Sequence, residues 1–301
     1  MGETRRMHYV PKTYLKHFAR EDATKGKPEY FISSIDKVTG KFKEINIVNL
    51  CVDKDIYRVN GKTEEERQVL EDMYRIMFED GYDDLYRILT NDNIIFMTQS
   101  QRDSIINFVV SMFYRNKVWN DIYQHFMDGL FEKAFNVSKK NGQTSFFIED
   151  EEISIEGKSL DDLKREYRKK DGPMGAMTSA HKIFQHARLR RIQDVISVTK
   201  LKCEHEYITS DHPVVCRNTP GIHTIPMDPD NRLSIAISNK YLLELIPMKD
   251  DEINFLMIGR MPTTSFMGSL SSATHNDAQI GQSDKFLFGS SNTIKGFKVK
   301  T

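Results

Sequence analysis

The sequence has few cysteines, no long apolar run and no net charge, and each of these absences excludes a class of protein. Its three cysteines cannot all pair, which argues against a disulfide-stabilised secreted fold and favours a reducing compartment. No stretch approaches the roughly 18 apolar residues of a membrane-spanning helix. Residues 1–6 carry basic side chains with no apolar run behind them, so we expect no secretory signal. The sequence therefore predicts a cytoplasmic protein that does not bind a membrane.

The charges also restrict the choice of partner. Forty-three basic residues balance 43 acidic ones, so the chain as a whole is not attracted to nucleic acid. The basic run at 164–170 contains one tyrosine and is more typical of a solvated helix face than of a nucleic-acid groove. A nucleic-acid partner stays open but is not favoured.

Several motifs of cofactor and metal enzymes are missing as well. There is no Gly-x-x-x-x-Gly-Lys-Ser/Thr loop, no Gly-x-Gly-x-x-Gly after a strand, no His-Glu-x-x-His and no Gly-x-Ser-x-Gly. Cys203-x-His205 and His212-x3-Cys216 lack the repeated Cys-x2-Cys spacing of structural zinc sites, and core thiols beside surface histidines explain them equally well. We expect no structural zinc, and the sequence leaves the cofactor unknown, with a divalent cation still open.

The hydrophobic pattern changes from helical to strand-like along the chain. Apolar residues alternate at 30–45, recur at intervals of three and four at 64–89 and 99–135, and indicate short strands after residue 197. We predict a single α+β domain over residues 1–301, in which a helical middle segment packs on a sheet formed by N-terminal and C-terminal strands. The 99–135 segment is long enough for two helices or one kinked helix.

Residues 136–175 differ from this pattern and predict a peripheral insertion. They contain Asn141-Gly142, an acidic run at 149–152 and Gly172-Pro173, which favour a mobile or partly strand-forming excursion. A further helix is expected over 176–196.

Two short segments about 200 residues apart carry the best candidates for a site. His8-Tyr9-Val10-Pro11 lies in extended chain, because Pro11 disfavours helical geometry at the residue before it. The His8 imidazole there suits a general base, a metal ligand or a phosphate partner, or else it satisfies a buried carbonyl. Ser210-Asp211-His212-Pro213 follows the apolar pair Tyr207-Ile208, so its side chains are expected at the rim of a sheet. Asp211 can orient a histidine or bind a cation, or it can bind backbone amides in a turn.

Arg115 and two C-terminal amides complete the candidate set. Arg115 follows a long apolar helical face, so it needs an internal partner such as Asp211 or an anionic ligand. Asn276 and Gln279 are spaced to share one helix face and can donate to a ligand, although such residues more often cap helices.

These segments together resemble the domain of unknown function 4238 family, which is widespread in bacteria. The likeness includes His8 to Pro11, Tyr14-Leu15, Phe18-Ala19, Arg115, Ile208 to Val215 and the stretch from Asn276 to Phe288. The chain departs from the family pattern at His212, where an Asn is expected, and at Asn116-Lys117, where Thr-Pro is expected. The resemblance implies no activity, cofactor or substrate. It does imply that His8, Arg115, Ser210, Asp211 and Asn276 belong to one recurring pattern.

The leading hypothesis from the sequence is a hydrolase of a phosphate-bearing substrate, a nucleotide or nucleic acid. In it His8 is the general acid or base, Arg115 neutralises the phosphate, and Asp211 orients His8 or holds a cation. Tyr9, Ser210, Asn276 and Gln279 bind the ligand. The alternatives are a non-catalytic ligand-binding or regulatory module, for example in a bacterial defence or toxin system, and a purely structural role for the same residues.

Overall fold

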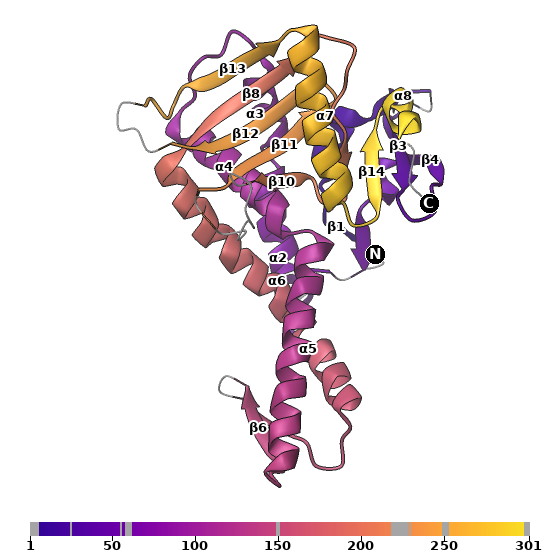
Figure 1. Ribbon diagram of the computed structural model, residues 1–301, viewed down its shortest axis with the longest axis vertical. Coiled ribbons are helices and arrows are strands. Elements are labelled where there is room, and N and C mark those ends of the chain that lie inside the picture. Colours follow the sequence, from indigo (N-terminus) through magenta and orange to yellow (C-terminus); the bar gives the residue numbers. More distant parts are fainter. Residues whose placement is uncertain are drawn as a thin grey trace.

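The computed structural model describes residues 6–24, 26–54, 56–57, 62–148, 151–217, 228, 230–248 and 253–297, and only the backbone of residues 120, 122, 123 and 169–180. These residues form a head and an arm that projects from it (Figure 1). The head contains the sheets and most of the helices, and the arm consists of two antiparallel helices with a small hairpin. The predicted α+β class is confirmed.

The larger sheet of the head has five strands in the order β10-β11-β12-β8-β13. Strand β13 is parallel to β8, and the other neighbours are antiparallel. All five strands come from the C-terminal half of the chain: β8 (Asp194–Leu201), β10 (Val214–Arg217), β11 (Arg232–Ser238), β12 (Tyr241–Pro247) and β13 (Ile258–Thr263).

The two faces of this sheet differ in polarity. Leu233, Ile235 and Leu243 are buried in the main hydrophobic cluster, which also contains the apolar face of α4 (Gln99–Tyr114). Successive side chains of a strand point to opposite faces, so Ser234 and Glu244 lie on the other side. The helical middle segment therefore packs on the apolar face of the C-terminal sheet, while the polar face is turned towards α7 (Ser265–Gln282) (Figure 1).

The smaller sheet joins the two ends of the chain, as predicted. Its strands run in the order β2-β3-β14-β9, with β4 also paired to β3, and Phe288 of β14 lies opposite Ser34 of β3. The short strands β1 and β5 pair beside it. These elements are β1 (Arg6–His8), β2 (Arg20–Asp22), β3 (Glu29–Asp36), β4 (Phe42–Asn46), β5 (Val52–Lys54), β9 (Thr209–Ser210) and β14 (Phe286–Gly289).

The remaining helices of the head begin at residues that suit helix starts. Thr63 and Thr98 each form a capping box, in which the threonine side chain and a Glu or Gln three residues later bond each other's backbone N–H groups. The helical elements are α1 (Lys12–Leu15), η1 (Lys16–Phe18), η2 (Ile47–Asn49), α2 (Glu64–Tyr74), the π-helical turn η3 (Arg75–Glu79), α3 (Tyr82–Thr90) and α8 (Ser291–Gly296).

The 99–135 segment forms two helices, α4 and α5 (Lys117–Lys140), and not one kinked helix. The break falls at Arg115 and Asn116. The Asn116 side chain accepts from the backbone N–H of Trp119 and donates to the carbonyl of Phe113, so it starts α5 and completes the last turn of α4. Arg115 is thereby fixed at the junction of the two helices.

The arm corresponds to the predicted insertion but is longer and more regular. It contains most of α5, the hairpin of β6 (Ser145–Ile148) and β7 (Glu151–Ser154), and the first half of α6 (Leu160–Gln193). The helix predicted over 176–196 thus begins 16 residues earlier, at Leu160, and continues through Gly172-Pro173. The arm has its own hydrophobic cluster, formed by Met127, Phe131, Phe146, Ile155 and Leu163. Helix α6 is packed on both sides of Gly172-Pro173, by Leu163 in this cluster and by Ile183 and Ala187 in the main cluster, and this packing favours one continuous helix.

None of the helices in the described ranges is both long enough and apolar enough to span a membrane. Cys51, Cys203 and Cys216 all lie in described segments and form no disulfide with one another.

Candidate functional site

Arg115 lies in a closed cluster of internal partners. Its side chain is 2% exposed, and Nη1 is 2.7 Å from the carboxylate of Glu79, the last residue of the π-helical turn. Nη2 donates to the carbonyl of His8 at 2.9 Å. The guanidinium also lies over the rings of Tyr74 and Tyr57, at 4.6 and 5.3 Å from their centroids. Burial opposes the charge, but Tyr57 and Glu79 outweigh it and raise the pKa of Arg115. The arginine therefore joins four segments of the chain.

His8 meets Arg115 through its backbone and not through its ring. The half-buried imidazole lies beside Lys12, and burial, followed by the charge of that lysine, lowers the pKa of His8 to about 4. The ring is therefore neutral at pH 7. The described partners of the Arg115 side chain are Glu79, the aromatic rings and this carbonyl, so the Asp211 partnership considered from the sequence is replaced by Glu79.

The Asp211 carboxylate is occupied by backbone amides. One oxygen accepts from the N–H of Asp284 at 3.0 Å, and the other accepts from Lys285 and Phe286 at 2.8 and 2.9 Å. Burial raises the pKa of Asp211 even though these three donors favour the ionised form. The side chain thus holds the segment after β9 against the start of β14, which is the turn role considered as the alternative in the sequence.

Ser210, Asn276 and Gln279 hold the same segment from two sides. The Ser210 hydroxyl donates to the carbonyl of His212 and accepts from its N–H, closing a tight turn. On α7, Asn276 accepts from the N–H of Ile208 at 3.0 Å, and Gln279 donates to the carbonyl of Pro213 at 2.6 Å. Asn276 also donates to the carbonyl of Glu206, so these amides clamp α7 to residues 206–213.

Tyr9 connects this clamp to the N-terminal segment. A hydrogen bond joins its hydroxyl to the Cys51 side chain, and burial, followed by Cys51 and Asp211, raises the pKa of Tyr9. The predicted residues therefore form two neighbouring clusters. One contains His8 and Arg115, and the other contains Tyr9, Ser210, Asp211, Asn276 and Gln279. The described contacts give both clusters a role in holding the ends of the chain together.

His212 leads to a pH prediction. Burial lowers its pKa to about 4, so between pH 6.5 and 4 the unfolded chain binds a proton that the folded chain does not. The contribution of His212 to the free energy of unfolding of the wild type is therefore fully present above pH 6.5 and is lost as the pH falls towards 4. We expect the free energy of unfolding of His212→Asn to fall less than that of wild type over this range, by about 2 to 3 kcal/mol. Urea unfolding at pH 7, 5.5 and 4 measures the difference, and parallel curves would contradict it.

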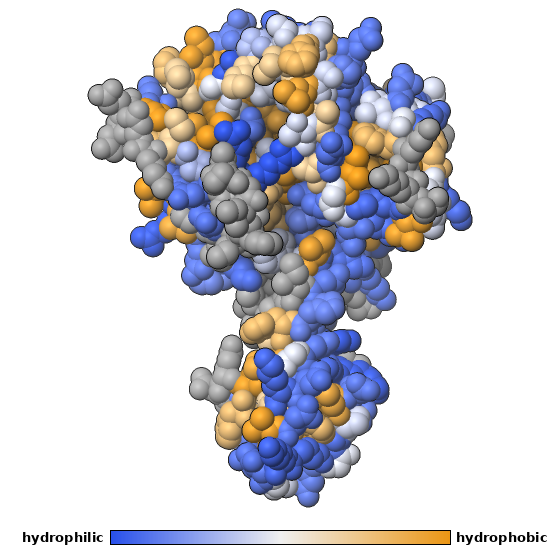
Figure 2. Space-filling model, viewed as in Figure 1, coloured by the Kyte–Doolittle hydropathy of each residue, from blue (hydrophilic) through white to orange (hydrophobic). Residues whose placement is uncertain are grey.

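A separate pocket lies between the polar face of the larger sheet and α7. It has a volume of about 390 Å³ and is lined by Thr199, Arg217, Arg232, Ser234, Leu242, Glu244, Met261, Thr263, Met267, Leu270, Ser271, Thr274 and His275. We call it the sheet–helix pocket. Helix α7 approaches the strands closely because Gly268 has no side chain. A Cβ there would lie 2.6 Å from Cys203 Sγ and 3.0 Å from Thr263 Oγ1. Figure 2, on the same face as Figure 1, shows hydrophilic and hydrophobic atoms side by side over this region.

The charges of the sheet–helix pocket are not balanced. Arg217 and Arg232 lie directly opposite each other on β10 and β11. The carboxylate of Glu244, on the next strand, is 3.5 Å from Arg232. Burial raises the pKa of Glu244 although both arginines oppose the shift, and burial lowers the pKa of Arg217. Asp277, exposed on α7, is the other carboxylate that acts on Arg217. With one lining carboxylate against two arginines, the pocket favours an anion.

His275 is a buried residue in the lining of this pocket. Its side chain is 3% exposed, and Nε2 is buried and has no partner among the described residues. Burial, followed by the charge of Arg217, lowers the pKa of His275 to about 3, so the ring is neutral at pH 7. Buried polar atoms are normally paired. Because Nε2 of His8 is also buried and unpaired, this atom supports the sheet–helix pocket only together with the two arginines.

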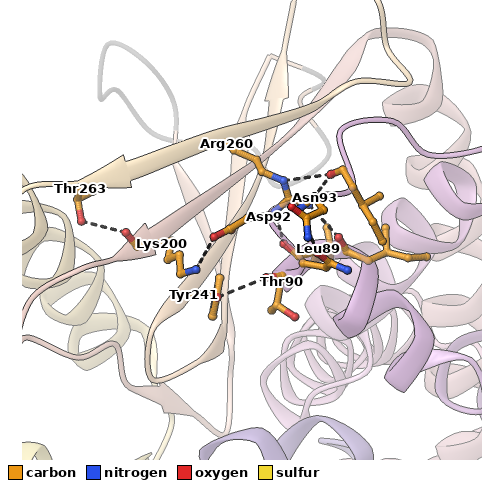
Figure 3. Close-up of polar contacts among 11 residues, drawn as sticks. Leu89, Thr90, Asp92, Asn93, Lys200, Tyr241, Arg260 and Thr263 are labelled. Carbon is orange, nitrogen blue, oxygen red and sulfur yellow. Dashed lines mark hydrogen bonds and ion pairs between the residues drawn. The ribbon is translucent and has the colours of Figure 1, made fainter.

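Two further basic residues of the larger sheet, Arg260 and Lys200, have a structural role. Figure 3 shows Arg260 of β13 pointing at the end of α3, where it donates to the carbonyls of Ile88, Leu89 and Ile94 at 2.7 to 3.1 Å. Lys200 pairs with Asp92 at 2.6 Å. These bonds satisfy carbonyls at a helix C-terminus and fix the edge strand β13 to the helical layer.

Among the described residues, no group of three or more His, Cys, Asp or Glu side chains is close enough together to hold a metal ion. The sheet–helix pocket instead offers hydrogen bonds and two guanidinium groups for an organic or inorganic anion.

The family model described as protein of unknown function (DUF4238) matches residues 6–293 of the chain. The chain belongs to this family. No curated protein and no solved structure shows significant similarity to it. The match includes the two clusters, the sheet–helix pocket and the arm, so membership of DUF4238 does not by itself favour one of them as the site.

The residues of the sheet–helix pocket were missed by reasoning from the sequence. The strand pattern over 233–237 is recognisable, but Arg217, Arg232 and Glu244 become neighbours only through the register of three strands. One local indication was present. In β11 the polar residues Arg232 and Ser234 alternate with the buried Leu233 and Ile235, which predicts a polar sheet face.

Proposed function

We propose that this member of DUF4238 is a non-catalytic ligand-binding module that holds a small anionic molecule in the sheet–helix pocket. The observation that carries the proposal is the pair of arginines, Arg217 and Arg232, placed opposite each other in a cavity of about 390 Å³ with one lining carboxylate. Like charges directly opposite on neighbouring strands are destabilising, and a bound anion relieves the repulsion.

The hydrolase expected from the sequence requires His8, Arg115 and Asp211 to face one substrate. The contacts of these residues support another role. Arg115 is bound by Glu79 and the His8 carbonyl, and Asp211 is bound by three amides. This supports the binding module over the hydrolase. We further propose a reducing cytoplasm as the place of action, which the absence of a disulfide among the three cysteines supports.

Stabilisation by inorganic phosphate tests the proposed function. Binding to the folded state adds RT ln(1 + [L]/Kd), about 1.4 kcal/mol at ten times Kd, so the melting temperature should rise with phosphate concentration. Arg232→Gln should abolish the rise, because it removes one of the two opposed cations. The side chain of Arg232 is 43% exposed, so the variant should fold.

Arg20→Gln is the matched control for this experiment. Arg20 is 58% exposed and lies 3.5 Å from a glutamate on a strand, as Arg232 does, but it is on the smaller sheet. The control should keep the full response to phosphate. An equal response in Arg232→Gln and Arg20→Gln would contradict the proposal, since the ion would then act on the surface in general.

A further inference from the structure

The sheet–helix pocket has three kinds of wall, and each can be matched to a part of a ligand. The first is the cationic wall of Arg217, on the edge strand β10, and Arg232, on its neighbour β11. Nη2 of Arg217 donates to the carbonyl of Thr274, which fixes this guanidinium against α7. Two arginines on one side of a cavity match an oxyanion with several acceptor oxygens, and phosphate has three.

The second wall is rich in hydrogen-bonding groups that are not charged. The hydroxyls of Thr199 and Ser234 come from the sheet, and those of Ser271 and Thr274 come from α7. Next to them lies the buried and unpartnered Nε2 of His275. Glu244 adds a carboxylate that accepts from hydroxyl groups. Such a wall matches a part of the ligand that carries hydroxyls, as a sugar does.

The third wall is apolar and lies at the mouth of the pocket. Met261, Met267 and Leu270 are 54%, 52% and 53% exposed, although all three are large hydrophobic residues. Methionine side chains are flexible and polarisable, and they cover flat ring systems well. Three half-exposed apolar side chains beside a polar cavity match a planar ring that is partly open to solvent.

We propose that the sheet–helix pocket binds a nucleoside monophosphate, with the phosphate at Arg217 and Arg232, the ribose along the hydroxyl wall and Glu244, and the base against Met261, Met267 and Leu270. This inference rests on the proposed function and names its ligand. The cavity of about 390 Å³ falls in the usual size range of small-molecule sites. A phosphate-bearing ligand also agrees with the substrate class expected from the sequence, although at different residues.

Calorimetric titration of the full chain at pH 7 tests the assignment. The ligands are AMP, GMP, CMP and UMP, with adenosine, ribose 5-phosphate, inorganic phosphate and octanoate as partial matches. At least one nucleoside monophosphate should bind ten or more times tighter than adenosine, ribose 5-phosphate and phosphate. Binding of all four monophosphates no tighter than ribose 5-phosphate would overturn the inference, because the base would then make no contact.

Two variants test the contributions of the cationic wall and of the apolar wall separately. Arg232→Gln should weaken the binding of the nucleotide at least tenfold and leave the affinity for adenosine unchanged. Arg20→Gln should change neither affinity. Met267→Ala, at an exposed position, should weaken the nucleotide several-fold and leave ribose 5-phosphate unchanged. If Met267→Ala lowered the affinity for the nucleotide and for ribose 5-phosphate by the same factor, the base would lie elsewhere and the assignment would be overturned.

The outcomes also distinguish this inference from the proposed function. If phosphate or octanoate binds in a manner that depends on Arg232 and no nucleotide binds better, the nucleotide assignment fails and the anion-binding module stands. If no anion in the series depends on Arg232, both fail.

Discussion

Replacing Arg115 with alanine is expected to lower the free energy of unfolding by about 3 to 5 kcal/mol, the range for breaking one side of a buried ion pair. The change leaves Glu79 without its cation and the carbonyl of His8 without its donor. It also empties the space over Tyr57 and Tyr74. Urea unfolding followed by far-ultraviolet circular dichroism gives the value.

Arg75→Ala is the matched control, because Arg75 makes two ion pairs, with Asp72 and Asp80, at 52% exposure. It should leave the free energy of unfolding nearly unchanged. A hydrolase in which Arg115 binds the substrate predicts the opposite for Arg115→Ala, namely a folded and inactive protein. An Arg115→Ala variant as stable as Arg75→Ala would therefore contradict the structural role.

Asp211→Ala is expected to destabilise the fold by a similar amount, about 3 to 5 kcal/mol. The reason is that three backbone N–H groups lose their acceptor, and a hydrogen bond to a charged group contributes about 1.5 to 3 kcal/mol before relaxation. These donors belong to Asp284, Lys285 and Phe286, at the start of the strand that joins the two ends of the chain. Thermal and urea unfolding both measure the loss.

The control is Asp36→Ala, at the last residue of β3, directly before the turn to β4. Asp36 also accepts two backbone N–H groups, from Val38 and Thr39 at 2.9 and 3.0 Å, and lies 3.7 Å from Lys285. Its side chain is 15% exposed, compared with 4% for Asp211, so water can replace part of these contacts. The loss of stability should be clearly smaller than for Asp211→Ala. Equal losses would show that the buried position of Asp211 contributes nothing and would contradict the clamp.

Local patterns predicted those parts of the fold that depend on neighbouring residues. The alternation at 30–45 became the β3–β4 hairpin, and the helical spacing at 99–135 became α4 and α5. The break at Asn116 is an N-cap, which is a local device. The start of α6 was misplaced because Gly172-Pro173 argues for a break, whereas packing of α6 on both sides of these residues keeps the helix continuous.

The candidate site was harder to predict because it depends on contacts between distant residues. The sequence indicated that Arg115 needs an internal partner or an anionic ligand, but its partner Glu79 is placed by a π-helical turn that has no simple pattern. The opposition of Arg217 and Arg232 follows from strand register. The register is set by the whole sheet, so no single segment contains this information.

The most direct measurement follows the two histidines that report on the two candidate sites. At pH 7 the rings of His8 and His275 are both neutral, because burial lowers their pKa values to about 4 and about 3. A change in their nuclear magnetic resonance signals on addition of the tightest-binding nucleoside monophosphate therefore reports the ligand and not a proton. The account predicts that the His275 ring nitrogens shift and those of His8 do not. A shift of His8 with no change at His275 would contradict it and would place the ligand at the residues first expected from the sequence.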